Sequence, residues 1–201
     1  MRHFVVVLTA SVLIAVSCRT ARPSGVAFAP LHSSTSDGAI AELQERLTAF
    51  RGARALLRVR ATSGANTQSF RAQLFVRDAR RVELTAYTPV GTVSATLKAD
   101  GDRVLFRESG KEQQELSARN LTGSFGVFGS TLTPAQLAML IIGLPAEGVS
   151  SLSASAAGLE HAAAGDLDVV FDPAVYPPTH VTITRGSDRI EIELLDLGAN
   201  D

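Results

Sequence analysis

Few side chains in this sequence have the type and spacing needed for acid–base, nucleophilic or metal chemistry. The histidines are His3, His32, His161 and His180, and none stands at metal-ligand spacing from another histidine, aspartate or glutamate. The chain also has no Gly-x-Ser-x-Gly nucleophile elbow. We therefore expect no metal, no cofactor and no catalytic residues, which favours a binding function over an enzymatic one.

Two further patterns indicate structure rather than chemistry. Gly123, Gly126 and Gly129 are spaced like a phosphate-binding loop, but the preceding Gly-x-Gly and the following Lys-Ser/Thr are missing. We interpret this apolar segment as a lid. Glu191 and Glu193 alternate with isoleucines, which predicts that they form the solvent face of a strand.

The N-terminus carries the one position where a covalent modification is expected. Phe4 to Val16 is almost wholly apolar, follows a short basic stretch, and is too short to span a bilayer comfortably, as in a signal peptide. Ala15-Val16-Ser17-Cys18 then resembles the bacterial lipobox, in which the cysteine is lipidated. Because Cys18 is the only cysteine, no disulfide is expected. We predict a signal peptide over residues 1–17 and a lipid anchor on Cys18.

Charge and composition indicate how the rest of the chain is organised. Removal of residues 1–17 would leave 18 basic and 20 acidic residues, which is no electrostatic footprint for nucleic acid. Residues 18–35 are rich in proline and serine and predict a flexible tether, which leaves 36–201 as one domain. Arg19 follows the cysteine in place of the aspartate that retains lipoproteins in the inner membrane, which points to the outer membrane.

Hydrophobic periodicity predicts a helix, a meander of strands, two helices and a final set of strands. The first helix is expected over 37–50, with Asp37 as its N-cap. A helix over 133–142 has clearer signals: Thr133 at the N-cap, Pro134 at the first helical position and Gly143 just past the end. The other expected helix covers 117–128, and strands are expected over 56–61, 69–77, 81–87, 92–99, 103–107, 111–116, 167–171, 179–184 and 189–195. Residues 146–165 have no pattern that places their strands.

This order predicts an α+β, mainly β fold. A meander of this length is expected to curl into an incomplete antiparallel barrel, because flat sheets of many strands are uncommon. The apolar helices are then the natural cover for its concave face. We expect the covered space to be an apolar cavity.

The stretch Tyr87-Thr-Pro-Val-Gly-Thr92 predicts a tight turn with an unusual residue at its tip. Pro89 suits the second position of a type I turn and Gly91 the fourth, so the apolar Val90 takes the third. Polar residues or glycine are usual there.

Three stretches, in this order after a lipobox, resemble the LolB and LolA-like family of lipoprotein-localisation proteins. They are ELTAYTPVGT (83–92), ADGDRVLFRESGKEQQELSA (99–118) and TLTPAQLAMLIIGLPAEG (131–148), and the closing DRIEIELLDL (188–197) also matches in place. The family's usual tryptophans are absent, since the chain has none.

The resemblance implies a lipid-binding protein of the outer membrane that faces the periplasm. Such proteins accept lipoprotein acyl chains from a periplasmic LolA-like carrier and insert the lipoproteins into the outer membrane. The family's protruding loop corresponds to Pro89, Val90 and Gly91, which would then contact the bilayer during insertion. We expect a monomer.

Inward-facing positions of the predicted elements identify the residues expected to line the cavity. They are Phe70, Leu74, Val82, Leu84, Val93, Leu97 and Phe106 from strands, and Phe125, Phe128, Leu137, Leu140 and Ile141 from the lid. The same residues could instead pack as a solid core. Two other functions therefore stay open: a carrier of another amphiphile such as a glycolipid, and a structural lipoprotein that is a scaffold for an outer-membrane complex.

Overall fold

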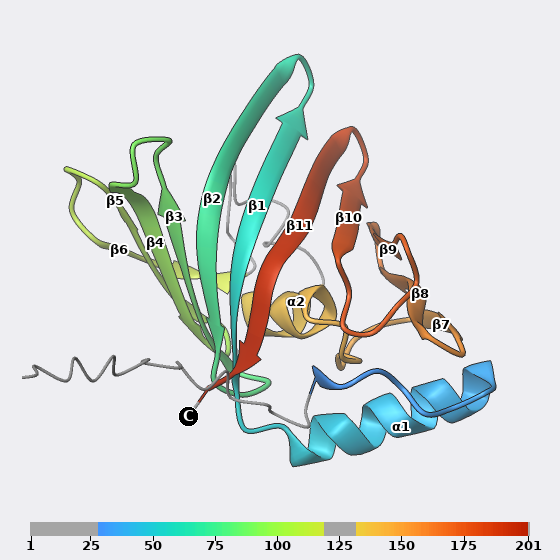
Figure 1. The fold of residues 1–201 in the computed structure, drawn as a ribbon. Coiled ribbons are helices and arrows are strands. Elements are labelled where there is room, and N and C mark those ends of the chain that lie inside the picture. Colours follow the sequence, from blue (N-terminus) through green and yellow to red (C-terminus); the bar gives the residue numbers. More distant parts are fainter. Residues whose placement is uncertain (1–27, 119–131, 201) are drawn as a thin grey trace, which may run out of the picture.

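The computed structural model describes residues 28–118 and 132–200, which form a curved antiparallel sheet and two helices (Figure 1). The sheet has eleven strands and is open, because its outermost strands do not pair with each other. The mainly β, incomplete-barrel fold predicted from the sequence is thus confirmed. The elements are α1 Ser36–Ala49, β1 Ala53–Ser63, β2 Asn66–Val76, β3 Arg81–Tyr87, β4 Val93–Asp100, β5 Arg103–Glu108, β6 Gln114–Ser117, α2 Pro134–Ile141, β7 Ser151–Ser155, β8 Gly158–Ala164, β9 Leu167–Phe171, β10 His180–Arg185 and β11 Asp188–Ala199.

The strand order joins the two halves of the chain in the middle of the sheet. The order is β6-β5-β4-β3-β2-β1-β11-β10-β9-β8-β7, so two meanders meet where the first strand pairs with the last. Val59 of β1, for example, lies opposite Ile192 of β11 and Phe70 of β2. This pairing brings residues from both ends of the domain onto one stretch of the concave face.

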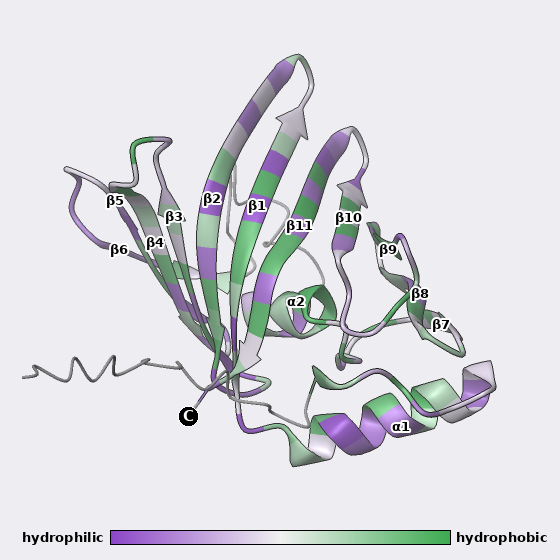
Figure 2. Cartoon of the chain, in the orientation of Figure 1, coloured by the Kyte–Doolittle hydropathy of each residue, from purple (hydrophilic) through white to green (hydrophobic). Residues whose placement is uncertain are grey.

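Strict alternation along the strands separates an apolar concave face from a charged convex face. Strand β1 alternates buried and exposed residues from Ala53 to Arg60, and β3 alternates buried residues with exposed or half-buried ones along its whole length. Figure 2 shows the same alternation of hydrophilic and hydrophobic residues along β1, β2 and β11. The convex face carries charges that pair across strands, such as Arg58 with Glu193. Burial of the concave face therefore fixes the register of the sheet.

The helix α2 lies inside the trough and packs against β2, β3 and β4 (Figure 1). Its predicted ends are confirmed. Thr133 accepts a hydrogen bond from the Gln136 backbone N–H at 3.3 Å, while the Gln136 side chain accepts one from the Thr133 N–H at 2.8 Å, which completes a capping box. Nearly every residue of α2 is buried, as expected for a helix without a polar face.

The helix α1 lies beneath one end of the trough and packs against β7 and β8 (Figure 1). Its N-cap is Thr35, whose side chain accepts from the Gly38 N–H at 3.2 Å, so the prediction of Asp37 is wrong. Residues 28–34, which the sequence places in the tether, lie along α1 with Phe28 and Leu31 against the core.

Two further segments differ from the sequence-based expectations or extend beyond the described residues. Residues 146–165 hold β7 and β8, which sequence periodicity did not place. The predicted helix over 117–128 lies largely outside the described residues, and Ser117 itself ends β6. Within residues 28–118 and 132–200, no helix is long and apolar enough to cross a membrane.

Tyr176, in the loop between β9 and β10, predicts a measurable loss of stability at alkaline pH. The residue is 4% exposed, and its burial raises the pKa of its hydroxyl from 10.0 to about 12, against a smaller lowering by the Arg46 charge. Because the pKa is raised in the folded protein, the contribution of Tyr176 to stability is complete below pH 10 and is lost as pH rises towards 12. We expect this residue to lower the free energy of unfolding by about 1 kcal/mol between pH 9 and pH 11. Urea unfolding of Tyr176→Phe at both pH values is expected to lack this part of the decrease, and an equal decrease in both proteins would contradict it.

Candidate lipid-binding cavity and rim loop

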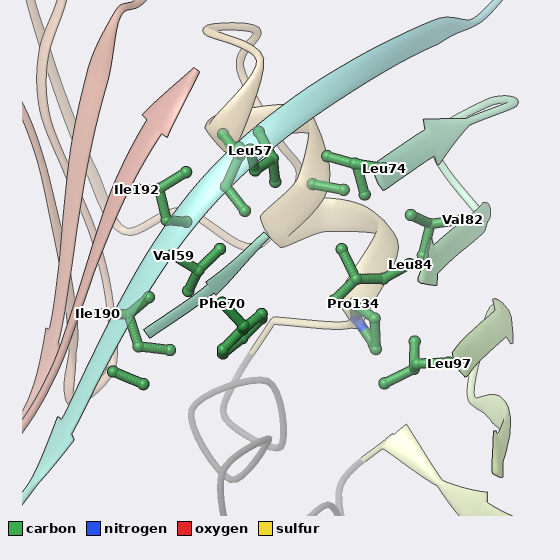
Figure 3. A pocket seen from close by; sticks show the side chains of 13 residues that line it. Leu57, Val59, Phe70, Leu74, Val82, Leu84, Leu97, Pro134, Ile190 and Ile192 are labelled. Atoms are coloured by element: carbon green, nitrogen blue, oxygen red, sulfur yellow. The ribbon is translucent and has the colours of Figure 1, made fainter. Parts of the chain in front are cut away.

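A wholly apolar cavity lies between α2 and the concave face of the sheet (Figure 3). Thirteen side chains line it: Leu57, Val59 and Ala61 from β1, Phe70 and Leu74 from β2, Val82 and Leu84 from β3, Leu97 from β4, Pro134, Ala138 and Ile141 from α2, and Ile190 and Ile192 from β11. None of these side chains has a charged or hydrogen-bonding group. The site can therefore hold apolar groups and offers its ligand no acid–base or metal chemistry.

The cavity owes its position to the periodicities of a helix and of strands. Pro134, Ala138 and Ile141 recur at helical spacing, so they share the face of α2 that points to the sheet. The strand residues recur at every second position, which places them on the concave face. Small residues at Ala61 and Ala138 leave space that larger side chains would fill.

The open volume in this conformation is small. The cavity volume is about 30 Å³, whereas an engineered apolar cavity that binds benzene has about 150 Å³. An acyl chain could enter only if α2 and the facing side chains moved apart. The described conformation is thus a closed one, with α2 resting on the sheet.

The structure brings six of the twelve predicted cavity residues to this site. Phe70, Leu74, Val82, Leu84, Leu97 and Ile141 all line it. Leu137 and Leu140 are fully buried but lie on a neighbouring flank of α2, and Phe106 is half-buried against the edge of the core. Phe125 and Phe128 lie outside the described residues.

Val93 does not face the cavity, and a β-bulge explains why. The β3–β4 register shifts after Ala86, so that Ala86 lies opposite Ala95 while Tyr87 lies opposite Val93. The shift adds one residue to β4, which breaks the inward alternation expected for positions 93, 95, 97 and 99. Val93 is 43% exposed at the rim, so its prediction as a cavity residue is corrected.

Seven lining residues were not predicted: Leu57, Val59, Ala61, Pro134, Ala138, Ile190 and Ile192. The alternation in 56–61 and 189–195 already marked five of them as inward-facing. The missing information was that β1 and β11 are neighbours at the centre of the sheet.

The loop between β3 and β4 forms an apolar tip at the rim of the trough. The Gly91 N–H donates to the Thr88 carbonyl at 2.9 Å, which confirms a turn with Pro89 second and Val90 third. Thr88 and Thr92 close the turn, since the Thr88 N–H donates to the Thr92 carbonyl at 2.8 Å and their hydroxyls lie 2.8 Å apart. Gly91 has φ +87°, as the residue after a type I turn in a three-residue hairpin loop requires. The loop holds Val90 at 86% exposure.

The remaining chemistry-bearing residues of the described part lie on surfaces. His161 pairs with Asp168, and His32 lies 3.3 Å from Glu42. Glu191 lies 3.9 Å from Arg60 across the β1–β11 pair, as expected for a strand's solvent face. Among residues 28–118 and 132–200, no group of three or more metal-ligating side chains could hold a metal ion. The glycine-rich segment from Gly123 to Gly129 lies outside these ranges.

Comparison with solved structures identifies the fold. A LolA superfamily protein from Nitrosomonas europaea matches with a TM-score of 0.52 and 7% identity, over 83% of this chain and 94% of the other. A domain described as an outer membrane lipoprotein-sorting protein from Vibrio parahaemolyticus matches with a TM-score of 0.52 and 10% identity, over 82% and 93%. A DUF1329 family protein from Desulfovibrio piger gives 0.53 and 5%, over 81% and 90%. No family model and no curated protein matches the sequence. The chain thus has a LolA-like fold.

Proposed function

We propose that the protein binds acyl chains in the cavity beneath α2 and passes lipidated cargo to the outer membrane. The observation that carries this proposal is the wholly apolar cavity under a helix in an open, LolA-like sheet. An apolar space without polar anchor points suits flexible hydrocarbon better than a small polar metabolite. Cargo would be lipoproteins accepted from a periplasmic LolA-like carrier.

The proposed location follows from the N-terminus. Residues 1–17 would be removed as a signal peptide, Cys18 would carry the acyl anchor, and the domain over 36–201 would face the periplasm as a monomer. More than one acyl chain on the cysteine makes such an anchor stable. The protein would therefore meet its cargo at the membrane that receives it.

The cost of exposing acyl chains to water explains why a cavity is needed. Three chains of about 15 CH₂ groups, at about 0.8 kcal/mol per group, set an upper bound of roughly 35 kcal/mol. Collapse of free chains lowers this figure, but even a third of it prevents free diffusion. Transfer must then run from cavity to cavity and from cavity to bilayer.

The rim loop supports delivery to a bilayer. Val90 projects from a turn that hydrogen bonds hold closed, and Pro89 and Val93 beside it are also exposed. Burial of one valine in the bilayer interface contributes at most about 1–2 kcal/mol. Val90 can therefore orient a protein that Cys18 already anchors, although it could not anchor the protein by itself.

We expect Val90→Glu to leave folding and fatty-acid binding unchanged and to impair lipoprotein insertion. A carboxylate at the tip would have to lose its hydration to enter the interface. Insertion into liposomes by the purified lipidated protein is the measurement. Ser187→Glu, in the exposed turn between β10 and β11, is the matched control and is expected to insert normally. Normal insertion by Val90→Glu would show that the loop is only a turn and takes no part in insertion.

The small open volume keeps the scaffold function as the second candidate. Titration of delipidated protein with a fluorescent fatty acid separates the two, because a scaffold with a solid core is expected to show no saturable binding. Depletion of the protein in its native cell then separates lipoprotein cargo from another amphiphile such as a glycolipid. Normal sorting of lipoproteins after depletion would overturn the leading proposal.

A further inference from the structure

We propose that residues 28–34 form a clasp, which fastens the tether to α1 and thereby limits how closely the rim loop at Val90 can approach the membrane. The inference rests on the proposed function, because it takes Cys18 as the membrane anchor. Residues 28–34 run beside α1 at the base of the trough (Figure 1). The tether is therefore shorter than the Pro/Ser-rich composition of residues 18–35 suggests.

Aromatic contacts hold the first residue of the clasp. The Phe28 ring stacks on the Tyr176 ring, with centroids 6.4 Å apart and planes 21° apart. The Arg46 guanidinium carbon lies 4.9 Å from the centroid of the same Tyr176 ring. Because Tyr176 is fully packed in the domain, its ring is a rigid base for Phe28.

Polar contacts hold the following residues against the same helix. Arg46 donates to the carbonyl oxygens of Ala29 and Pro30, the latter at 3.1 Å. Glu42, one turn earlier on α1, pairs with Arg46 and accepts from the His32 backbone N–H at 2.9 Å. Two side chains of α1 thus bind the backbone of three clasp residues, Ala29, Pro30 and His32. A segment held at so many points is a docked element.

The clasp and the apolar rim loop lie at opposite ends of the domain. Strand β3 leads from the base of the trough to the rim loop (Figure 1). From Arg81 to Thr88, where the turn begins, the chain rises by about 23 Å, at about 3.3 Å per residue. When Val90 touches the bilayer of an upright molecule, Phe28 is therefore about 23 Å or more from that surface.

The tether can cover this distance easily only when the clasp is open. About ten residues separate Cys18 from Phe28, which is roughly 35 Å at full extension and roughly 17 Å as a relaxed chain. Release of the clasp up to Ser36 raises these values to roughly 60 Å and 23 Å. A closed clasp favours a rim loop turned away from the membrane, towards a periplasmic donor. An open clasp lets the rim loop reach the bilayer for delivery.

Energy transfer to membrane dyes tests the clasp in the full-length, lipidated protein. A donor dye on Ser187→Cys, at the rim, and a rhodamine lipid in liposomes report how often the rim is near the bilayer. Phe28→Ala removes the stacking contact and is expected to raise the ratio of near to distant molecules about three- to tenfold. Ser34→Ala, an exposed position in the same segment, is the matched control and is expected to behave as the unaltered protein.

A second variant leaves the folded domain unaltered. Insertion of about ten Gly/Ser residues between Cys18 and Phe28 lengthens the tether with the clasp closed, and it is expected to raise the same ratio. Unchanged ratios for Phe28→Ala in protein that stays on the liposomes would overturn the clasp alone. Protein that leaves the liposomes altogether would overturn the Cys18 anchor and, with it, this inference.

Discussion

Replacement of Leu97 by alanine is expected to lower the free energy of unfolding by about 3 kcal/mol and to increase the stabilisation given by a bound fatty acid. Leu97 is 2% exposed and lines the cavity from β4. Loss of its terminal carbons removes apolar burial and leaves a void that the surroundings fill only in part. Because this void joins an existing apolar cavity, an acyl chain could occupy it.

Leu167→Ala is the matched control for this result. Leu167 is 1% exposed in β9, packs in the hydrophobic core and is not among the residues that line the cavity. Its truncation is expected to lower the free energy of unfolding by a similar amount without changing the stabilisation given by a bound fatty acid. Thermal unfolding with and without a long-chain fatty acid measures both, since ligand at a hundredfold excess over Kd adds about 2.7 kcal/mol. A fatty-acid response that is the same in both variants would contradict a binding site beneath α2.

The sheet's faces could be predicted from sequence because burial imposes a period of two on each strand separately. Val82, Leu84 and Ala86 alternate with Arg81, Glu83 and Thr85, and the structure buries the first set. Pairing between distant strands has no such local signal. The pairing of Val59 with Ile192 requires the first and the last strand of the domain to become neighbours. Ile190 and Ile192 could therefore be predicted to face inward but could not be assigned to the cavity.

Residues near turns and in the Ala-rich segment were harder to predict for local reasons. The bulge that turns Val93 out of the cavity inserts one residue where alternation still looks regular, because alanine and valine alternate with polar residues on both sides. In β7 and β8, alanine and serine are small enough to fit either face, so the period is weak. Thr35 and Asp37 are both good N-cap residues by type, and the helix begins after Thr35.

The binding function itself could be predicted only as far as an apolar concave face with a helical cover. Ile141 was predicted to face inward, but the stripe that it forms with Pro134 and Ala138 needs the orientation of α2 on β2–β4. Whether such a face encloses a solid core or a cavity depends on side-chain volumes from five strands and a helix. Sequence periodicity carries no information about that balance.

The loop after α2 fixes this orientation, and Gly143 is the residue on which it depends. The Leu144 N–H donates to the Met139 carbonyl at 2.9 Å and the Gly143 N–H to the Leu140 carbonyl at 2.8 Å, which is a Schellman motif that ends α2. Gly143 has φ +83°, a conformation that side chains with a Cβ disfavour. A Cβ on Gly143 would lie 2.6 Å from Pro178 Cδ and 3.0 Å from Tyr176 Cδ2.

Gly143→Ala is therefore expected to lower the free energy of unfolding by about 2–5 kcal/mol, the combined cost of the left-handed backbone and of overpacking. Gly186→Ala is the matched control, because Gly186 has φ +57° and a Cβ there would meet nothing within 4 Å. It is expected to lose only the backbone part, about 1–2 kcal/mol. Urea unfolding of both proteins measures the difference, and equal losses would show that Pro178 and Tyr176 yield to the new methyl group. If they do not yield, the end of α2 must shift away from them, and fatty-acid affinity is expected to change in Gly143→Ala alone.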